Sequence, residues 1–309
     1  MLIHSASQLL TLTGEPQRGS DLGRLGIIPN GALLVRDGRI AEIGSTGELC
    51  HRYPDEQMLD AGEHVVMPGF VDPHTHLIWA GNRAAEFELR LQGKTYLEIL
   101  AAGGGILSTV NRTRQSSVED LLKETRPRLW DMLSHGTTTA EAKTGYGLET
   151  ATELCMLEAL IKLDAEGPLE LALTFLGAHA IPPEYKGDPD SYTKHVCHEM
   201  LPAVHAWWLA HTPGKPLPFV DVFCETGAFS LAQSRCILET ARALGFSLKV
   251  HADEFDNLGG ASLAAELGAV SADHLVKTSA SDIAALARSD TIAVGLPCTP
   301  FGLAEREYT

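Results

Sequence analysis

The feature that most constrains this chain is an apolar run over residues 65–71 that leads directly into His74 and His76. The run is rich in β-forming residues, which is typical of a parallel strand buried on both faces. Two histidines at positions i and i+2 of a strand project from the same face, so their imidazoles lie side by side. Neighbouring neutral imidazoles begin a chelate for a transition metal. The segment therefore predicts a metal site at the carboxyl end of a buried strand, where barrel enzymes carry their chemistry.

Further apolar strands alternate with helical patterns along residues 65–309. The expected strands are 65–71, 136–142, 171–178, 219–225, 246–252, 269–273 and 291–297, and the expected helices include 118–134, 149–164, 190–210, 230–244, 258–267 and 279–288. This alternation predicts an α/β fold with a parallel sheet, and so many units predict a (β/α)₈ TIM-type barrel. Because only about seven strands are present, we expect the eighth βα unit to be missing.

Residues 1–64 differ from the remainder in their pattern. Two short β-forming runs flank Asp37 and Gly38, and an Asp-Gly pair between such runs is a strong hairpin signal. We interpret this segment as half of a small N-terminal β-sandwich subdomain, and we expect its returning strands to be missing as well. The predicted domains are therefore 1–64 and 65–309.

Charge and cysteine content limit the partners and the compartment. The 309 residues carry a formal net charge of −16, which argues against nucleic acid or an anionic membrane surface as a partner. An anionic small-molecule substrate remains compatible, because a local arginine outweighs a distant field. Six scattered cysteines favour reduced thiols, and neither a secretory signal nor an apolar stretch of ~18 residues is evident. We expect a cytoplasmic protein, for which a homodimer is compatible with the sequence.

Three more histidines fall at the ends of expected strands, namely His179, His251 and His274. Any one of them could be an ordinary core histidine, but their convergence on one barrel mouth favours a metal centre with His251 as third ligand. Three nitrogens leave a position open for water, whose pKa a bound metal lowers toward ~7. Glu254 and His274 lie within plausible reach to move protons.

Several longer stretches carry a family resemblance. They are Asp72–Arg90, Ala102–Ile106, Lys143–Gly147, Phe175–His179, Pro182–Tyr185, Phe223–Phe229 and Asp256–Gly260. In these stretches the chain resembles the amidohydrolase superfamily and, within it, the imidazolonepropionase family. The resemblance implies hydrolysis of 4-imidazolone-5-propanoate to N-formimidoyl-L-glutamate in histidine degradation, with one divalent or trivalent ion, Zn or Fe.

The resemblance also implies roles for individual residues. The metal positions are His74, His76 and His251, the substrate-contacting positions are Arg83, Tyr96, Tyr146, His179 and Glu254, and the catalytic positions are Glu254 and His274. The guanidinium of Arg83 suits a propionate carboxylate. Glu254 matches the position that hydrogen-bonds the imidazolone ring, and His274 matches the one that polarises the carbonyl or relays a proton.

The chain departs from the family at one ligand. The family's fourth metal ligand is an aspartate at the end of the eighth strand, and this sequence lacks it. Asp273 is the nearest substitute, but strand alternation next to His274 predicts that it points away. The expected fourth strand, 219–225, has no lysine to bridge two ions, so a single metal is favoured. For Lys143 we expect a structural or substrate-orienting role.

Two alternatives stay open. One is another mononuclear amidohydrolase, such as a deaminase of a purine or pyrimidine ring. Arg83 discriminates against it, because a carboxylated substrate needs a cation there and a neutral base does not. The other is a non-catalytic fragment that binds metal or partners without turnover, and the missing eighth strand is its main support.

Overall fold

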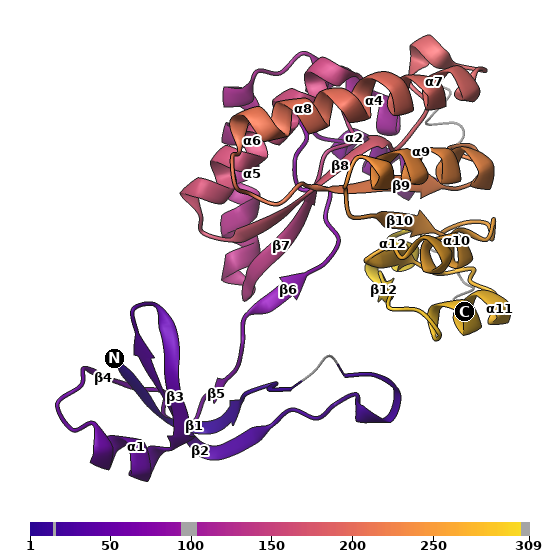
Figure 1. Ribbon diagram of the computed structural model, residues 1–309. Coiled ribbons are helices and arrows are strands. Elements are labelled where there is room, and N and C mark those ends of the chain that lie inside the picture. Colours follow the sequence, from indigo (N-terminus) through magenta and orange to yellow (C-terminus); the bar gives the residue numbers. More distant parts are fainter. Residues whose placement is uncertain (15–16, 94–103, 304–309) are drawn as a thin grey trace. The chain divides into compact units, whose positions relative to one another are not determined.

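The computed structural model describes residues 1–14, 17–93 and 104–303 (Figure 1). The chain forms two compact units, Met1–Phe70 and Val71–Thr309. Each unit has its own sheet and its own buried apolar cluster. They are considered in turn.

The first unit is a small sheet in the order β3-β2-β1-β4, with β5 also pairing β1. Its strands are β1 (Leu2–Leu10), β2 (Ile27–Arg36), β3 (Arg39–Ser45), β4 (Met58–Asp60) and β5 (Val65–Val66), accompanied by η1 (Gly19–Asp21) and α1 (Thr46–Arg52). β2 and β3 form the hairpin expected from the sequence. Its turn residues Asp37 and Gly38 have φ of 51° and 71°, the left-handed conformation that a two-residue hairpin turn requires.

The second unit is built on a seven-stranded sheet in the order β12-β11-β10-β9-β8-β7-β6. The strands are β6 (Phe70–Asp72), β7 (Thr137–Lys143), β8 (Glu170–Ala178), β9 (Phe219–Cys224), β10 (Lys249–Ala252), β11 (Ser271–His274) and β12 (Ile292–Gly295). Pairing is parallel from β7 through β12. The expected α/β class with parallel barrel strands is confirmed.

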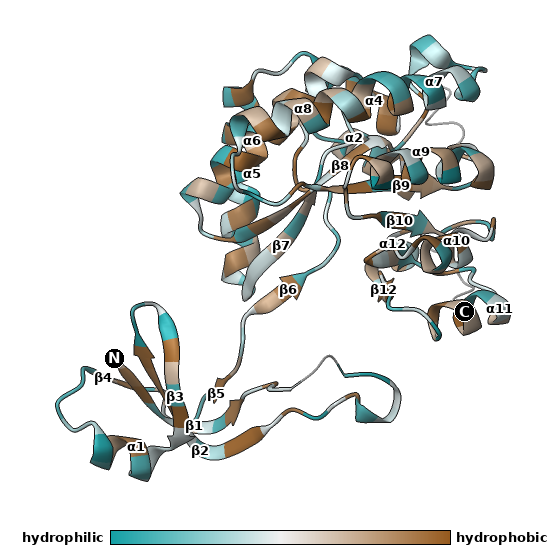
Figure 2. Cartoon of the chain, in the orientation of Figure 1, coloured by the Kyte–Doolittle hydropathy of each residue, from teal (hydrophilic) through white to brown (hydrophobic). Residues whose placement is uncertain are grey.

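Helices alternate with these strands and cover the sheet (Figure 1). They are α2 (Ala84–Leu91), α4 (Ile106–Arg114), α5 (Val118–Ser134), α6 (Thr150–Glu166), η2 (Pro183–Tyr185), α7 (Pro189–His195), η3 (Val196–Met200), α8 (Leu201–His211), α9 (Leu231–Ala243), α10 (Gly260–Leu267), α11 (Ala280–Leu286) and α12 (Cys298–Gly302). Figure 2 shows hydrophobic residues along β8 and β9. In the buried core, β8 packs against α6 and β9 packs against α9. No helix among the described residues is long and apolar enough to cross a membrane.

Local sequence explains where several helices begin. Ser117, Ser230 and Ser279 precede α5, α9 and α11, and each serine hydroxyl accepts a hydrogen bond from the backbone N–H three residues on. The side chain at that third position in turn accepts a hydrogen bond from the serine N–H. Such a capping box satisfies two N–H groups that the helix leaves unpaired. Of these helices, α9 and α11 follow strands, whereas α5 follows α4.

The single strand expected over residues 65–71 is wrong. Val65 and Val66 pair with β1 in the small sheet, whereas Phe70 begins the first strand of the large sheet. Pro68 and Gly69 lie between them. Proline lacks the N–H that a central strand needs, and glycine weakens a strand interior. The apolar run is therefore two short strands that belong to different sheets.

Candidate active site

Five histidines gather at the carboxyl ends of the parallel strands. His74 and His76 follow β6, His179 follows β8, His251 lies in β10 and His274 ends β11. The ring centroids of His74 and His251 are 4.5 Å apart, and those of His76 and His179 are 4.7 Å apart. The structure thus brings together the histidines that the sequence predicted to converge.

The prediction that His74 and His76 lie on a strand is wrong. Neither lies on a strand, because β6 ends at Asp72 and the backbone beyond it is irregular. The segment is held instead by its neighbour β7, since the N–H of Lys143 donates to the carbonyl of Thr75 at 3.0 Å. Strand alternation therefore does not explain the pair. Its ring centroids are still only 5.3 Å apart.

Carboxylates orient two of the rings. Nδ1 of His74 lies 2.6 Å from Oδ2 of Asp273, and Nδ1 of His251 lies 2.8 Å from Oδ2 of Asp221. A carboxylate that accepts a hydrogen bond from Nδ1–H leaves Nε2 with a free lone pair, which is how metal-binding histidines are usually held. Nε2 of His76 lies 3.2 Å from Nε2 of His251. These two Nε2 atoms are therefore close enough to bind a single ion.

The donor set fits a metal ion. Two nitrogens that each lie ~2.0–2.1 Å from one tetrahedral zinc are about 3.4 Å apart, close to the separation between His76 and His251. Nε2 of His74 is buried and has no hydrogen-bond partner. Among the described residues, His251 belongs both to a group with His74 and His274 and to a group with His76 and His179, with ligand atoms within 4.8 Å. His251 is therefore the residue common to the two groups made of histidines alone, and a third group consists of His74, Glu141 and Asp273.

Burial favours the neutral form of His76, His179, His251 and His274. Burial lowers the pKa of His179 to about 3, of His251 to about 4 and of His274 to about 2, and it also takes the pKa of His76 well below its usual value. The charges that the neighbouring imidazoles would carry lower these values further. A neutral imidazole is the form that binds a metal. These four rings can therefore bind a metal at neutral pH without first losing a proton.

A buried ionic cluster that the sequence did not reveal adjoins the histidines. Nζ of Lys143 lies 2.7 Å from Oε1 of Glu141 and 2.7 Å from Oδ2 of Asp221, and it is 3.7 Å from Asp273. Lys249 adds contacts of 3.5 Å to Glu141 and 3.4 Å to Asp273. Three carboxylates against two ammonium groups leave one excess negative charge in a dry interior. That excess favours a bound cation nearby.

The predicted direction of the Asp273 side chain is wrong. Strand alternation predicted that it points away from the site, yet its carboxylate is buried against His74. Alternation requires extended backbone, and His274 has φ of +80°, so successive side chains need not diverge there. Burial by itself would raise the pKa of Asp273, but the bond from His74 and the charges of Lys143 and Lys249 lower it to about 2.

A signal for this cluster is present in the sequence. Asp221 lies in the middle of the apolar strand Phe219–Cys224, and Glu141 and Lys143 lie two apart in β7. A charged side chain inside an apolar strand is costly unless it is paired. The pattern therefore predicts buried partners. Which strands supply those partners depends on the fold.

The predicted substrate-contacting residues fall in three places. The ring of Tyr146 lies 5.9 Å from that of His76 and 5.3 Å from that of His179. Arg83 lies at the start of α2 with 44% of its side chain exposed, and its Nε donates to Glu86 at 2.8 Å. Tyr96 lies outside the described residues. Tyr146 and His179 thus adjoin the histidine cluster, while Arg83 is exposed.

The surroundings of Tyr146 strongly shift the pKa of its hydroxyl. Burial raises the pKa of its hydroxyl to about 12, while the charges of Arg83 and Arg128 act to lower it. Arg83 is therefore close enough for its charge to act on the Tyr146 hydroxyl. A neutral phenol beside a mobile cation can contact an anionic ligand.

Glu254 lies beside His274, with Oε1 of Glu254 at 3.5 Å from Nδ1 of His274. Burial, and to a lesser degree the charge of Glu225, raises the pKa of Glu254 to about 7. Both ring nitrogens of His274 are buried without a hydrogen-bond partner. A carboxyl group that titrates near neutrality can both take and give a proton. The pair has the chemistry expected of the predicted catalytic residues.

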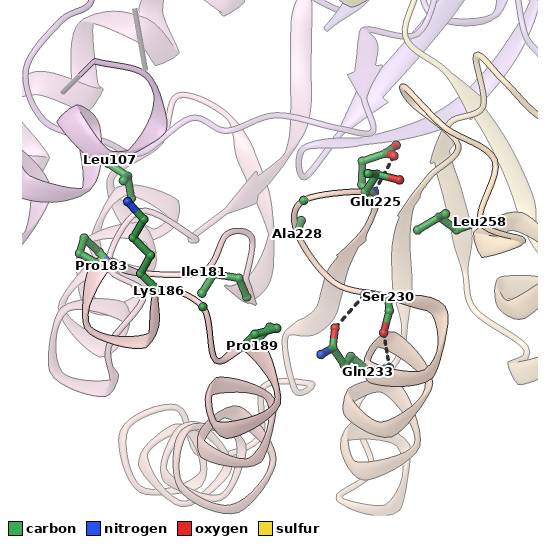
Figure 3. A pocket seen from close by; sticks show the side chains of 13 residues that line it. Leu107, Ile181, Pro183, Lys186, Pro189, Glu225, Ala228, Ser230, Gln233 and Leu258 are labelled. Carbon is green, nitrogen blue, oxygen red and sulfur yellow. Dashed lines mark hydrogen bonds between the residues drawn. The ribbon is translucent and has the colours of Figure 1, made fainter. Parts of the chain in front are cut away.

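A cavity of about 1010 Å³ lies among the loops that follow β8, β9 and β10 (Figure 3). Ile181 and Pro189 line it, as do Ala228 and Leu258. None of the five histidines is among the described residues that line it. We therefore place the chemistry at the histidines and not in this cavity.

Comparison with known proteins agrees with the geometry. A family model described as "Imidazolonepropionase-like composite domain, bacteria" matches residues 31–55. An imidazolonepropionase of Herpetosiphon aurantiacus is 51% identical over 308 residues, covering 100% of this chain and 72% of that protein. That of Symbiobacterium thermophilum is 49% identical over 311 residues, with 100% and 72% covered. The chain belongs to the imidazolonepropionase family. The resemblance inferred from the sequence is confirmed.

Solved structures support the fold of this imidazolonepropionase-family chain. An aminofutalosine deaminase of Helicobacter pylori superposes with a TM-score of 0.64 at 15% identity, over 100% of this chain and 72% of that one. A 5-methylcytosine deaminase of Klebsiella pneumoniae gives 0.64 at 16% identity, over 98% and 67%. At such identity the likeness concerns the fold alone. The predicted barrel-type fold is confirmed.

Proposed function

We propose that the protein hydrolyses a ring C–N bond of 4-imidazolone-5-propanoate and releases N-formimidoyl-L-glutamate in histidine degradation. Whole-chain identity of 51% to an imidazolonepropionase carries this proposal. The neutral histidine cluster beside Glu254 supports it, because hydrolysis of a cyclic amide needs an activated water and a group that moves protons. The net charge of −16 is compatible with an anionic small molecule and gives no support for a nucleic-acid partner. We assign the activity to the cytoplasm.

We infer that one metal ion, Zn or Fe, is held by His74, His76 and His251. Three observations support this assignment. Nε2 of His76 lies 3.2 Å from Nε2 of His251, Nε2 of His74 has no hydrogen-bond partner, and carboxylates lie against Nδ1 of His74 and His251. When bound, such an ion supplies the positive charge that makes an attacking water more acidic. His179 and His274 remain for contacts with the substrate.

The protein's own groups move the protons in this proposal. The carboxylate of Glu254 takes a proton from the water that attacks the ring carbonyl carbon, and it returns that proton to the ring nitrogen as the C–N bond breaks. A pKa of about 7 suits both halves of this exchange. Neutral His274 is the group that contacts the carbonyl oxygen.

Binding of the substrate is assigned to the remaining predicted residues. The propionate carboxylate replaces Glu86 as the partner of Arg83, since the fork of a guanidinium matches a carboxylate. Tyr146 and His179 contact the ring, and Tyr96 is a further proposed contact. Because a neutral purine or pyrimidine offers no carboxylate to Arg83, the deaminase alternative is less well supported.

The test uses the purified metal-loaded protein with 4-imidazolone-5-propanoate and, separately, with the same ring lacking the propionate. We expect N-formimidoyl-L-glutamate from the first substrate and at least tenfold lower kcat/KM with the second. Ammonia release from cytosine or guanine, without hydrolysis of the imidazolone, would instead establish the deaminase alternative.

A further inference from the structure

The loop that follows β7 has a backbone that needs outside support. It contains Gly145 with φ of +106° and Leu148 with φ of +54°. A leucine rarely adopts the left-handed region, so partners around the loop must hold it there. Between these two residues lies Tyr146, whose ring packs toward His179 at 5.3 Å. The loop therefore determines where a proposed substrate contact is placed.

Glu153 supports this loop from inside the protein. Its side chain is completely buried in the first turn of α6. Oε1 accepts hydrogen bonds from the backbone N–H of Gly147 at 2.8 Å and of Leu148 at 2.9 Å, and Oε2 accepts one from Gly145 at 3.1 Å. One carboxylate thus binds three amides of the loop. Bonds to a charged acceptor are about twice as strong as neutral ones.

Glycines allow the carboxylate to approach so closely. A Cβ on Gly147 would lie 2.9 Å from Oε1 of Glu153 and 2.8 Å from its backbone nitrogen. A Cβ on Gly145 would lie 3.1 Å from Nδ1 of His179. The carbonyl of Gly145 accepts a hydrogen bond from that same Nδ1 at 2.9 Å. The loop is consequently fitted to Glu153 on one side and to His179 on the other.

Arg114 binds the loop through two of its backbone carbonyls. Its Nε donates to the carbonyl of Gly147 at 2.7 Å, and its Nη2 donates to that of Leu148 at 3.3 Å. Glu184 pairs with the same guanidinium at 2.7 Å. The N–H groups of Gly147 and Leu148 thus donate to Glu153 while their carbonyls accept from Arg114, so both polar sides of the backbone are occupied there.

We propose that Glu153 is the positioning residue that sets Tyr146 and His179 in place for the ring of the substrate. It contacts neither of these side chains, and it acts through the amides of the loop and the Gly145 carbonyl. Because Glu153 touches none of the metal-binding histidines, its loss weakens ligand binding without removing metal. This inference rests on the proposed function for the identity of the ligand.

The test compares wild type with Glu153→Gln and Glu153→Asp, and uses Glu158→Gln as the matched control. Glu158 lies on the exposed face of the same helix, outside the loop, and pairs with Lys162 at 2.8 Å. Glutamine keeps the size of Glu153 but turns an amide N–H toward the donors of the loop, whereas aspartate keeps the charge on a shorter side chain. The second variant carries the test if the first fails to fold.

Two quantities are measured on each metal-loaded protein. One is hydrogen exchange of the segment 144–149, and the other is the Kd for imidazole-4-propanoate, which has the ring and carboxylate but no hydrolysable bond. In both Glu153 variants we expect faster exchange confined to this loop, a Kd raised about 10-fold to 100-fold and unchanged metal content. The Glu158 variant should match wild type in all three.

The outcomes separate this inference from the proposed function. Unchanged exchange of the loop in both Glu153 variants overturns the positioning role, whatever the ligand does. Faster exchange with an unchanged Kd also overturns it, since the loop would then not govern binding. If wild type itself fails to bind imidazole-4-propanoate, the proposed function loses its support, and loop exchange alone decides whether Glu153 positions Tyr146.

Discussion

Replacing Lys143 by methionine should strongly destabilise the protein. The ammonium group is fully buried and lies 2.7 Å from both Glu141 and Asp221. Lys249 still neutralises Glu141 after the change, but Asp221 keeps no ammonium partner. Removing one member of a buried ion pair typically costs about 3–5 kcal/mol, because the other charge stays buried and uncompensated. That is a large fraction of the ~5–15 kcal/mol by which most domains are stable.

Urea unfolding of the metal-free protein at pH 7 measures this cost. Lys162→Met is the matched control, since Lys162 pairs with Glu158 at 2.8 Å on an exposed helix face, where an ion pair contributes little. The Lys143 variant should unfold at a clearly lower urea concentration, and the control should unfold with wild type. Equal midpoints for all three proteins would refute the argument that the buried charge at Asp221 depends on Lys143.

The pH dependence of the same variant has a definite sign. In wild type the folded pKa of Asp221 lies well below its usual value, because the opposing effects of His251 and Lys143 outweigh burial. Such a group stabilises the fold above its unfolded pKa and loses that contribution as pH falls through its folded pKa. Without Lys143 the folded pKa rises, so the deficit of the variant should be smaller at pH 4 than at pH 7. A constant deficit would contradict an electrostatic origin.

Three further predictions concern the site. Arg83→Met should raise KM for imidazolonepropionate at least tenfold, because a charge-assisted pair contributes ~1.5–3 kcal/mol, and an unchanged kcat/KM would exclude the role. In wild type, kcat/KM should fall as pH drops through about 7, where Glu254 becomes protonated. Glu254→Gln should remove that dependence, and an intact acid limb in the variant would assign it elsewhere. Asp221→Asn should weaken metal binding in chelator competition by about 10–100-fold, and wild-type affinity would show that the carboxylate does not orient His251.

Sequence patterns predicted best what depends on neighbours along the chain. The helix expected over residues 118–134 is α5 (Val118–Ser134), with Ser117 as its cap. The hairpin at Asp37 and Gly38 forms as expected, because turn chemistry is local. The prediction of one strand over residues 65–71 was wrong for two reasons. Apolar content does not indicate which sheet a short strand joins, and a proline divides the run.

The site was predictable as a set of histidines and not as a network. His74, His76 and His251 follow from their placement at strand ends and from the family resemblance. Asp221 was missed because it meets His251 from the neighbouring strand β9, a pairing that only the fold reveals, and the contact of Asp273 with His74 joins segments 199 residues apart. Asp273 was assigned the wrong direction because the alternation rule assumes extended backbone, which ends at His274.

Metal stoichiometry tests the central claim most directly. Elemental analysis would compare wild type with His251→Ala and with His198→Ala, since His198 is exposed and lies in η3 away from the cluster. His251 is a proposed ligand and belongs to two of the three possible coordination groups among the described residues, so its loss should abolish stoichiometric Zn or Fe while the His198 variant keeps one ion per chain. One tightly bound ion in the His251 variant would contradict the account.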